Sequence, residues 1–321
     1  MKYLKYLFIA VLFASCADDE DIQTNQEVVD YLNEVVDFME QYSIERNEID
    51  WVDFRNQVLE EGATAQSIED TDEALLLALS LLDDNNSYFE RPDGDIRSAA
   101  VYLNCENSNI SGISTPDNIE RLKLPPFDGN ANGLNATIAY AEIVQEEIQS
   151  RDNVNITGWI IDLRNNNSTG GISPLLAAGG PILGEGTAGY YVYPEFSSQE
   201  WSYEGGSAKI NGSHVIEVSE PYELINQNPK VAIIINKATS STAAALAIAF
   251  KGRPNTAIIG DDTCVPLLYN FNTVFSDFTY LRLAAANLAD REGNVYQDEI
   301  VPDIYADDAT AVQEAINYLN N

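Results

Sequence analysis

Two short runs of apolar residues constrain the fold of this chain more than any other feature. They read GWIID at residues 158–162 and VAIII at residues 231–235. A strand with one face in water alternates apolar and polar side chains, whereas a strand covered on both faces is apolar throughout. Both runs therefore predict buried strands of the parallel type.

Strand patterns alternate with helical patterns over residues 95–321, which predicts an α/β fold. The other expected strands or strand-rich segments are VYLNC (101–105), NIERLKLPP (118–126), AGYYVYP (188–194), SHVIEVSEP (213–221), TAIIG (256–260) and the segment 274–290. The expected helices are residues 133–152, 241–252 and 308–321. The glycine-rich stretch from Asn165 to Gly186 is expected to be irregular. It contains no lysine, which excludes a phosphate-binding P-loop of the usual kind.

The N-terminal part shows a different sequence pattern. It contains three helical patterns, at residues 27–43, 50–62 and 71–84. Apolar residues recur there at helical spacing. Asp50 is expected to cap the second helix, Gly62 to end it, and Thr71 to cap the third. These patterns predict a small helical N-terminal domain over residues 27–94, followed by a core domain over residues 95–321.

The first residues resemble an export signal. Lys2 and Lys5 precede an apolar run that is too short to span a bilayer, and small residues lead to Cys16. The pattern predicts a signal peptide over residues 1–15, a lipidated Cys16 and an acidic tether over residues 16–26. That tether resembles the surface-export signal of Bacteroidota lipoproteins, which favours an outer-membrane lipoprotein of the cell envelope facing the periplasm or the cell surface. A plain secretory signal is the alternative.

Charge and cysteine content limit the partners. The chain has 17 Lys and Arg against 51 Asp and Glu, a net charge of −34. Such a surface repels nucleic acid and anionic lipid, so no nucleic-acid partner is expected, and membrane contact is expected through the lipid anchor only. The single histidine argues against a zinc site of the usual kind, and no metal or other cofactor is predicted. Cys105 and Cys264 are either a disulfide or two free thiols.

Three hydroxyl residues, Thr239, Ser240 and Ser241, follow the VAIII run directly and precede an alanine-rich helical pattern. A serine on a sharp strand-to-helix turn exposes its Oγ, and the helix N-terminus supplies unpaired N–H groups. Ser241 is therefore a candidate nucleophile, although an N-cap hydroxyl is the simpler reading of the same position.

Two segments together resemble a known family. GWIIDLRNNNSTGG (158–171) and the strand–turn–helix–strand segment 231–263 are similar to the matching elements of the tail-specific, or C-terminal processing, serine peptidases. The KGRPN (251–255) and VPDI (301–304) segments look most like the nisin-resistance-protein branch. The resemblance implies a ClpP/crotonase-like ββα superhelix core. It also implies hydrolysis of peptide bonds through a serine acyl-enzyme, with a peptide or unstructured protein segment as partner.

The resemblance assigns roles to several residues. The spacing to Gly260 makes Ser241 the nucleophile, with Ser240 as the runner-up. The backbone of Gly170 and Gly171 would form the oxyanion hole, since glycine lets the main chain approach a substrate carbonyl closely. The turn before these glycines is two residues longer than the family's usual turn.

The polar partners of such a serine are missing. The lysine of one branch of the family corresponds to Pro266, the histidine of the nisin-resistance-like branch to Asn86, and the glutamate three residues after the nucleophile to Ala244. None of these side chains can accept a proton near neutral pH.

Other titratable groups do not rebuild the catalytic set. They are His214, Lys237, Lys251, Asp261 and Asp262, and each is more readily explained as a surface or capping residue. Two functions therefore stay open, a serine peptidase with an unrecognised base and an inactive peptidase-like protein that binds peptides or other ligands at the cell envelope.

Overall fold

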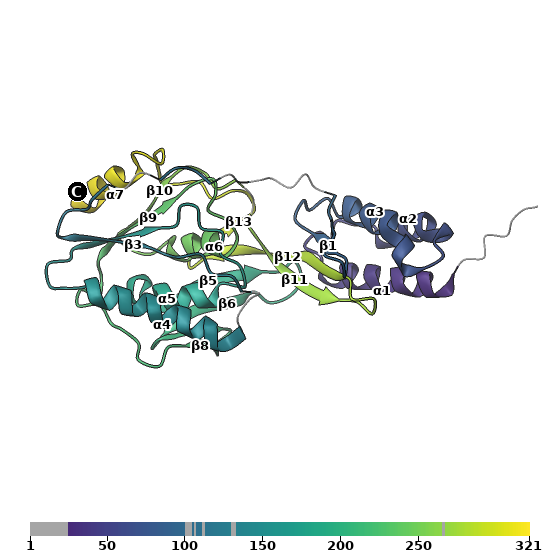
Figure 1. Cartoon of the computed structure of the whole chain (residues 1–321), viewed down its shortest axis with the longest axis horizontal. Coiled ribbons are helices and arrows are strands. Elements are labelled where there is room, and N and C mark those ends of the chain that lie inside the picture. Colours follow the sequence, from purple (N-terminus) through teal and green to yellow (C-terminus); the bar gives the residue numbers. More distant parts are fainter. Residues whose placement is uncertain (1–24, 100–104, 106, 111–112, 130–132, 265–266) are drawn as a thin grey trace, which may run out of the picture.

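The computed structural model describes residues 25–99, 105, 107–110, 113–129, 133–264 and 267–321. The expected signal peptide, Cys16 and most of the tether lie outside the described residues, as do Pro266 and residues 101–104 of the expected VYLNC strand. A helical region forms one end of the molecule and an α/β core the other (Figure 1). In the described ranges, no helix combines the length and the apolar character needed to cross a bilayer.

A five-stranded parallel sheet forms the centre of the core. Its order is β14-β10-β9-β4-β3, and every neighbouring pair is parallel. The strands are β3 (Ile119–Lys123), β4 (Gly158–Asp162), β9 (Lys230–Ile235), β10 (Thr256–Gly260) and β14 (Ile304–Tyr305). The two apolar runs are the adjacent strands β4 and β9. Both are buried strands of a parallel sheet, as their apolar sequences predicted.

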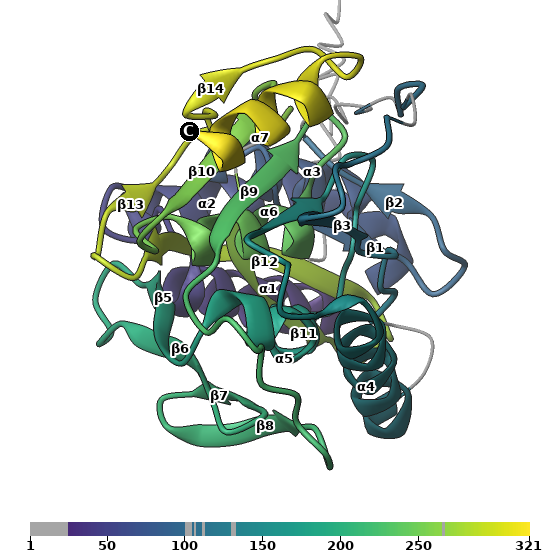
Figure 2. The same cartoon turned by 90° about the vertical axis from the view of Figure 1, so that its left-hand side faces the viewer.

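Helices cover both faces of this sheet. Alternate residues of β4 and β9 face α7 (Ala311–Asn320), while the residues between them face α5 (Ser173–Leu183) and α6 (Ser241–Phe250). Figure 2 shows α7 outside β9 and β10, with α6 on their other side. This double coverage is the physical reason for the unbroken apolar runs.

A second, nine-stranded sheet packs beyond α5 and α6. Its main path runs β2-β1-β12-β5-β6-β7-β8, and β11 and β13 also pair with β12. All its pairs are antiparallel. The strands are β1 (Tyr88–Glu90), β2 (Ile96–Arg97), β5 (Gly186–Val192), β6 (Gln199–Glu204), β7 (Ser207–Ile210), β8 (Ser213–Glu217), β11 (Leu268–Val274), β12 (Tyr280–Asp290) and β13 (Val295–Tyr296).

Half of the expected irregular stretch between Asn165 and Gly186 is in fact the helix α5, so that prediction was wrong for residues 173–183. The helix is almost completely buried and contains Pro181. Its glycines let large side chains approach: a Cβ on Gly180 would lie 2.1 Å from the ring of Tyr203. Tight packing of small residues against β6 and β7 therefore overrides their low helix propensity. The amphipathic helix α4 (Gly133–Arg151), which was predicted, packs beside α5.

The helical region consists of α1 (Gln26–Tyr42), α2 (Trp51–Glu61) and α3 (Asp72–Leu82), with 3-10 turns before α3. The Asp50 carboxylate accepts from the backbone N–H groups of Val52 and Asp53, and Gly62 follows the last residue of α2, as predicted. Thr71 precedes α3 but does not cap it with its side chain. Its hydroxyl donates to Ile68 O, because a 3-10 turn at residues 68–71 runs directly into the helix.

One strand belongs to both regions. Leu281 and Leu283 of β12 are buried with the three N-terminal helices, whereas Ala286 and Leu288 are buried with the core. The ladder with β11 shifts register between these two pairs of residues. The β11–β12 hairpin thus reaches from the core to the helices (Figure 1).

Candidate active site

The turn after β9 is held rigidly by its own polar side chains. Thr239 Oγ1 accepts from Asn236 N at 3.0 Å and donates to Leu163 O at 2.9 Å, which ties the turn to the end of β4. The Asn236 side chain bridges to Asn165. The residues that follow this turn are therefore fixed relative to both central strands.

Ser241 is the first residue of α6 and has a left-handed backbone, with φ of +51°. This conformation costs about 1–2 kcal/mol for a residue with a Cβ. Ser240 occupies the N-cap position, yet its side chain makes no cap hydrogen bond. Within the described residues, neither serine hydroxyl has a hydrogen-bond partner, so the simpler reading of Ser241 as a capping hydroxyl is not what the structure contains.

The longer turn before the glycines packs directly on this serine turn. Ser240 N donates to Asn166 O at 3.0 Å, and Thr242 N donates to Ser168 O at 2.9 Å. These bonds use the backbone donors on either side of Ser241. The N–H groups of Ser241 and Gly171 make no hydrogen bond to the part of the chain that the structure describes. They are the donors that an oxyanion would require.

Gly170 and Gly171 differ sharply in their surroundings. Both have positive φ, at +85° and +86°. A Cβ on Gly170 would lie 2.3 Å from Gly129 Cα, whereas a Cβ on Gly171 would meet nothing within 4 Å. Gly170 is thus fixed by close backbone packing, and Gly171 faces open space. The sequence analysis missed Gly129, because its contact with Gly170 spans 41 residues and carries no local pattern.

Replacing Gly170 with alanine should destabilise the protein more than replacing Gly171. Both variants bear the left-handed backbone cost of about 1–2 kcal/mol. Gly170→Ala adds the clash with Gly129, and overpacking typically costs about 1–3 kcal/mol. Urea denaturation of both variants measures the difference. Equal losses of unfolding free energy would contradict the close packing of Gly129 and Gly170.

The element around Asn86 is clamped onto β12. Asp84 Oδ1 accepts from the backbone N–H groups of Asn86 and Ser87, and Ser87 Oγ donates to Asp84 Oδ2. Ser87 Oγ in turn accepts from Ala284 N of β12 at 2.9 Å. This clamp fixes residue 86 against the strand that passes from the helical region into the core beneath α6.

Asn86 itself presents an unsatisfied group. Its Oδ1 atom is buried and has no hydrogen-bond partner in the described structure. A buried polar atom without a partner costs about 1–3 kcal/mol. Ala244, at the position of the family's glutamate, is buried in α6 and supplies no polar atom.

The other candidate bases already have partners elsewhere. His214 lies on β8, the edge strand of the larger sheet, with its Nδ1 2.8 Å from Ser207 Oγ. Lys251 follows the last residue of α6, about 15 Å along the helix from Ser241, and donates to Asp303.

Lys237 and the two aspartates after β10 also fail to reach the serine. Lys237 is exposed, with Nζ 3.7 Å from Asp261 Oδ2. Asp262 accepts from the Tyr305 hydroxyl. Across the described ranges, no titratable side chain hydrogen-bonds to Ser241 Oγ.

A buried ion pair supports the site from the end of β4. The carboxylate of Asp162 accepts from Arg164 Nε at 2.9 Å and Nη2 at 2.8 Å, and from Arg121. Burial acts to raise the pKa of Asp162, but the hydrogen bonds and charges of the two arginines outweigh it and hold the pKa below its usual range. Arg164 is fully buried, so this pair fixes the start of the 165–171 turn.

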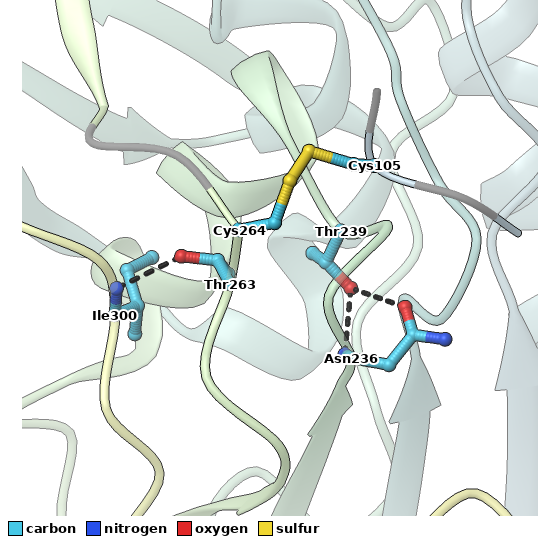
Figure 3. The surroundings of a disulfide bond; sticks show 6 residues. All are labelled: Cys105, Asn236, Thr239, Thr263, Cys264 and Ile300. Atoms are coloured by element: carbon cyan, nitrogen blue, oxygen red, sulfur yellow. Dashed lines mark hydrogen bonds between the residues drawn. A yellow bond between two sulfur atoms is a disulfide. The ribbon is translucent and has the colours of Figure 1, made fainter. Parts of the chain in front are cut away.

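A disulfide lies near Thr239, in the turn after β9 (Figure 3). It joins Cys105 to Cys264, with their Cα atoms 5.9 Å apart, within the range that a disulfide requires. The adjacent Thr263 Oγ1 accepts from Ile300 N (Figure 3). The bond ties the segment that leads out of the helical region to the loop after β10.

Comparison with known proteins identifies the scaffold. The family model "Peptidase family S41" matches residues 121–306, more than half of the chain. The chain belongs to peptidase family S41. This confirms the resemblance to the tail-specific serine peptidases. The S41 match contains Gly170, Gly171 and Ser241, whereas Asn86 precedes it.

Individual relatives agree with the family. The chain is 26% identical over 282 residues to the nisin-resistance protein of Lactococcus lactis subsp. lactis, which covers 87% of this chain and 83% of that protein. The structure of a lipoprotein from Streptococcus agalactiae superposes with a TM-score of 0.70 at 18% identity, covering 92% of this chain and 96% of the other. The photosystem II D1 C-terminal processing protease superposes with a TM-score of 0.59 at 15% identity, covering 92% and 97%. Both superpositions confirm the fold class.

Proposed function

We propose that this S41 family member binds peptides or unstructured protein segments in the Ser241 cleft and does not turn them over. The observation that carries the proposal is the missing general base. Ser241 Oγ has no base within hydrogen-bond reach in the described structure, and position 86 holds an asparagine. A serine peptidase needs its serine activated by a base, whereas a binding site does not.

The backbone around Ser241 suits capture of an extended peptide. The N–H groups of Ser241 and Gly171 can donate to a peptide carbonyl. Each of these hydrogen bonds forms without proton transfer. The site therefore keeps backbone donors that can bind a peptide and lacks the general base that cleavage requires.

The test is binding without cleavage. A fluorescently labelled unstructured peptide should raise its anisotropy on mixing with the wild-type protein and remain intact on a gel. A fluorophosphonate probe, which reacts only with an activated serine, should label wild type no more than Ser241→Ala. Ser240→Ala is the matched control at the neighbouring hydroxyl. Cleavage or labelling that disappears only in Ser241→Ala would overturn the proposal.

A second function, turnover by a serine peptidase with an unrecognised base, is favoured by one observation. Ser241 retains the strained left-handed backbone, with φ of +51°. Strain of this kind is retained mostly at functional sites, because the surrounding structure must be built to hold it. The labelling experiment distinguishes the two functions directly.

We also propose that the chain is an envelope lipoprotein anchored through Cys16. The sequence around Cys16 and the similarity to a streptococcal lipoprotein support this proposal. Replacing Cys16 with alanine should abolish incorporation of a palmitate analogue and move the protein from the membrane fraction to the soluble fraction. Continued membrane attachment of Cys16→Ala would contradict the lipid anchor.

A further inference from the structure

A cavity of about 500 Å³ lies at the opposite end of α5 and α6 from Ser241. The two helices run in the same direction. Their N-terminal ends are joined by the hydrogen bond from Thr242 N to Ser168 O, and their C-terminal ends by the bond from Arg253 Nε to Leu183 O. The cavity is therefore about 15 Å from the serine, the length of α6. We name it the arginine pocket, with walls that include Glu185, Tyr203, Pro221, Glu223, Arg253 and Arg291.

The two arginines of this pocket use only some of their N–H donors in hydrogen bonds within the described structure. Arg253 is 8% exposed and donates through Nε and Nη1 to carbonyl groups and to Thr256, which leaves Nη2 without a partner in the described structure. Arg291 donates through Nη2 to Ala249 O. Its Nε is buried without a hydrogen bond, and its Nη1 has none to the described residues.

Stabilising the C-terminal ends of α5 and α6 explains part of the hydrogen bonding of the two arginines. Leu183 O and Ala249 O lie at the C-terminal ends of α5 and α6, where a cation is favourable. That role leaves Arg253 Nη2 and Arg291 Nη1 without a hydrogen-bond partner in the described structure, and both residues line the cavity. An arginine carries five donors in a fixed fork, and a carboxylate is their matching acceptor.

The absence of a carboxylate partner is unusual in such an acidic chain. Although acidic residues outnumber basic ones by 51 to 17, neither Arg253 nor Arg291 has a carboxylate oxygen within 4.0 Å in the described part of the protein. Burial and the neighbouring charge of Arg291 lower the pKa of Arg253 to about 10. Burial also lowers the pKa of Arg291, and the charges of Asp290 and Glu292 act in the other direction, although neither carboxylate reaches its guanidinium within 4.0 Å. An anion between the two guanidinium groups would be attracted by both.

Two glutamates limit which anion fits. Glu185 and Glu223 line the same cavity, and Glu185 accepts from Gly205 N. A phosphate or a dicarboxylate would bring two negative charges towards these side chains. A molecule with one carboxylate and one ammonium group would satisfy the arginines and the glutamates together. The ring of Tyr203 and the side chain of Pro221 offer it an apolar wall.

We propose that the arginine pocket binds a free amino acid or a very short peptide in its zwitterionic form. The carboxylate is held by Arg253 and Arg291, and the ammonium group faces Glu185 and Glu223. A cavity of this volume belongs to the size range of small-molecule sites. The site is separate from the Ser241 cleft, so it does not depend on the function proposed there.

The experiment uses isothermal titration calorimetry with glycyl-leucine, its C-terminal amide and its N-acetyl derivative, each added to the full chain. Glycyl-leucine should bind, and the amide and the N-acetyl derivative should each bind at least tenfold more weakly. Arg291→Gln should weaken glycyl-leucine binding at least tenfold. Arg282→Gln is the matched control, because Arg282 also has a buried Nε without a partner but lies over the ring of Tyr88.

Glu223→Gln keeps the test decisive if Arg291→Gln fails to fold, because Glu223 is exposed. In that variant the difference between glycyl-leucine and its N-acetyl derivative should shrink at least threefold. Unchanged binding to Arg291→Gln would overturn the proposal, as would an unchanged difference in Glu223→Gln. Inorganic phosphate binding to wild type while glycyl-leucine does not would also overturn it, since the pocket would then be a simple anion site.

Discussion

Replacing Asp162 with asparagine is expected to lower the free energy of unfolding by about 3–5 kcal/mol. The Asp162 and Arg164 side chains are both fully buried, with Arg164 Nη2 2.8 Å from Asp162 Oδ2. Removing one partner of a buried ion pair is far more costly than the pair's own net contribution, because Arg164 would be left with only the more distant Asp308 carboxylate at 3.6 Å. Urea denaturation followed by circular dichroism measures the loss.

The matched control is Asp261→Asn. Asp261 is paired with Lys237 at 3.7 Å on the surface, where an ion pair contributes about 0–1 kcal/mol. A loss at Asp162 no larger than the loss at Asp261 would show that the buried pair is not important for stability.

The same carboxyl predicts a dependence of stability on pH. The pKa of Asp162 is lower in the folded protein than its ordinary value. The unfolded chain therefore binds the proton more readily, so the contribution of Asp162 to stability is present above about pH 4 and is lost as the pH falls through the folded pKa. Acid titrations of wild type and Asp162→Asn should accordingly converge at low pH and differ most near neutrality.

Replacing Asn86 with histidine is expected to raise the rate of peptide cleavage by about 10²- to 10⁴-fold over wild type. That is the range that general-base catalysis contributes. The clamp formed by Asp84, Ser87 and Ala284 already holds position 86 in place. An imidazole there would have an ordinary pKa of about 6.5, suited to accept the Ser241 proton near neutral pH.

The measurement is cleavage of an unstructured protein substrate by wild type, Asn86→His and Asn86→His/Ser241→Ala. Activity that survives in the double variant would come from a contaminant or another residue. The addition of Ala244→Glu tests whether the family's glutamate helps, although a carboxylate in that buried position must find a partner. No gain from Asn86→His would show that residue 86 and Ser241 do not meet in the cleft.

The parallel core could be predicted because the residues of each strand carry the signal themselves. Strands β4 and β9 are covered on both faces, and this alone produces near-continuous apolar runs. The helix α6 is apolar on every side for the same reason. By contrast, α5 was missed because its glycines and Pro181 oppose helix formation locally, and only the ring of Tyr203 and the sheet beyond it explain them.

The nine-stranded sheet was foreseen only in pieces. Strands β6 and β7 carry serines, lysine and glutamates, so their periodicity gives no clear strand signal. Their burial comes from α5, which lies in a different part of the sequence. Pairing across such distances leaves no trace within a window of ten residues.

The candidate site, too, could be predicted from the sequence only in part. The spacing around Ser241 and the glycines could be interpreted from the sequence. The left-handed backbone of Ser241 and the unsatisfied Asn86 Oδ1 could not, because both depend on how distant segments pack. The arginine pocket was equally hidden, since its walls come from the ends of two helices and the loops around them.

The shared strand β12 has a mechanical consequence. Its N-terminal half is buried with the three helices and its C-terminal half with the core, so the two regions lack the flexible hinge that usually joins neighbouring domains. Swinging them apart would break the ladder between β1 and β12 and expose Leu281 and Leu283 to water. The protein should therefore melt in a single calorimetric transition, and the N-terminal helices should keep a fixed orientation relative to the core.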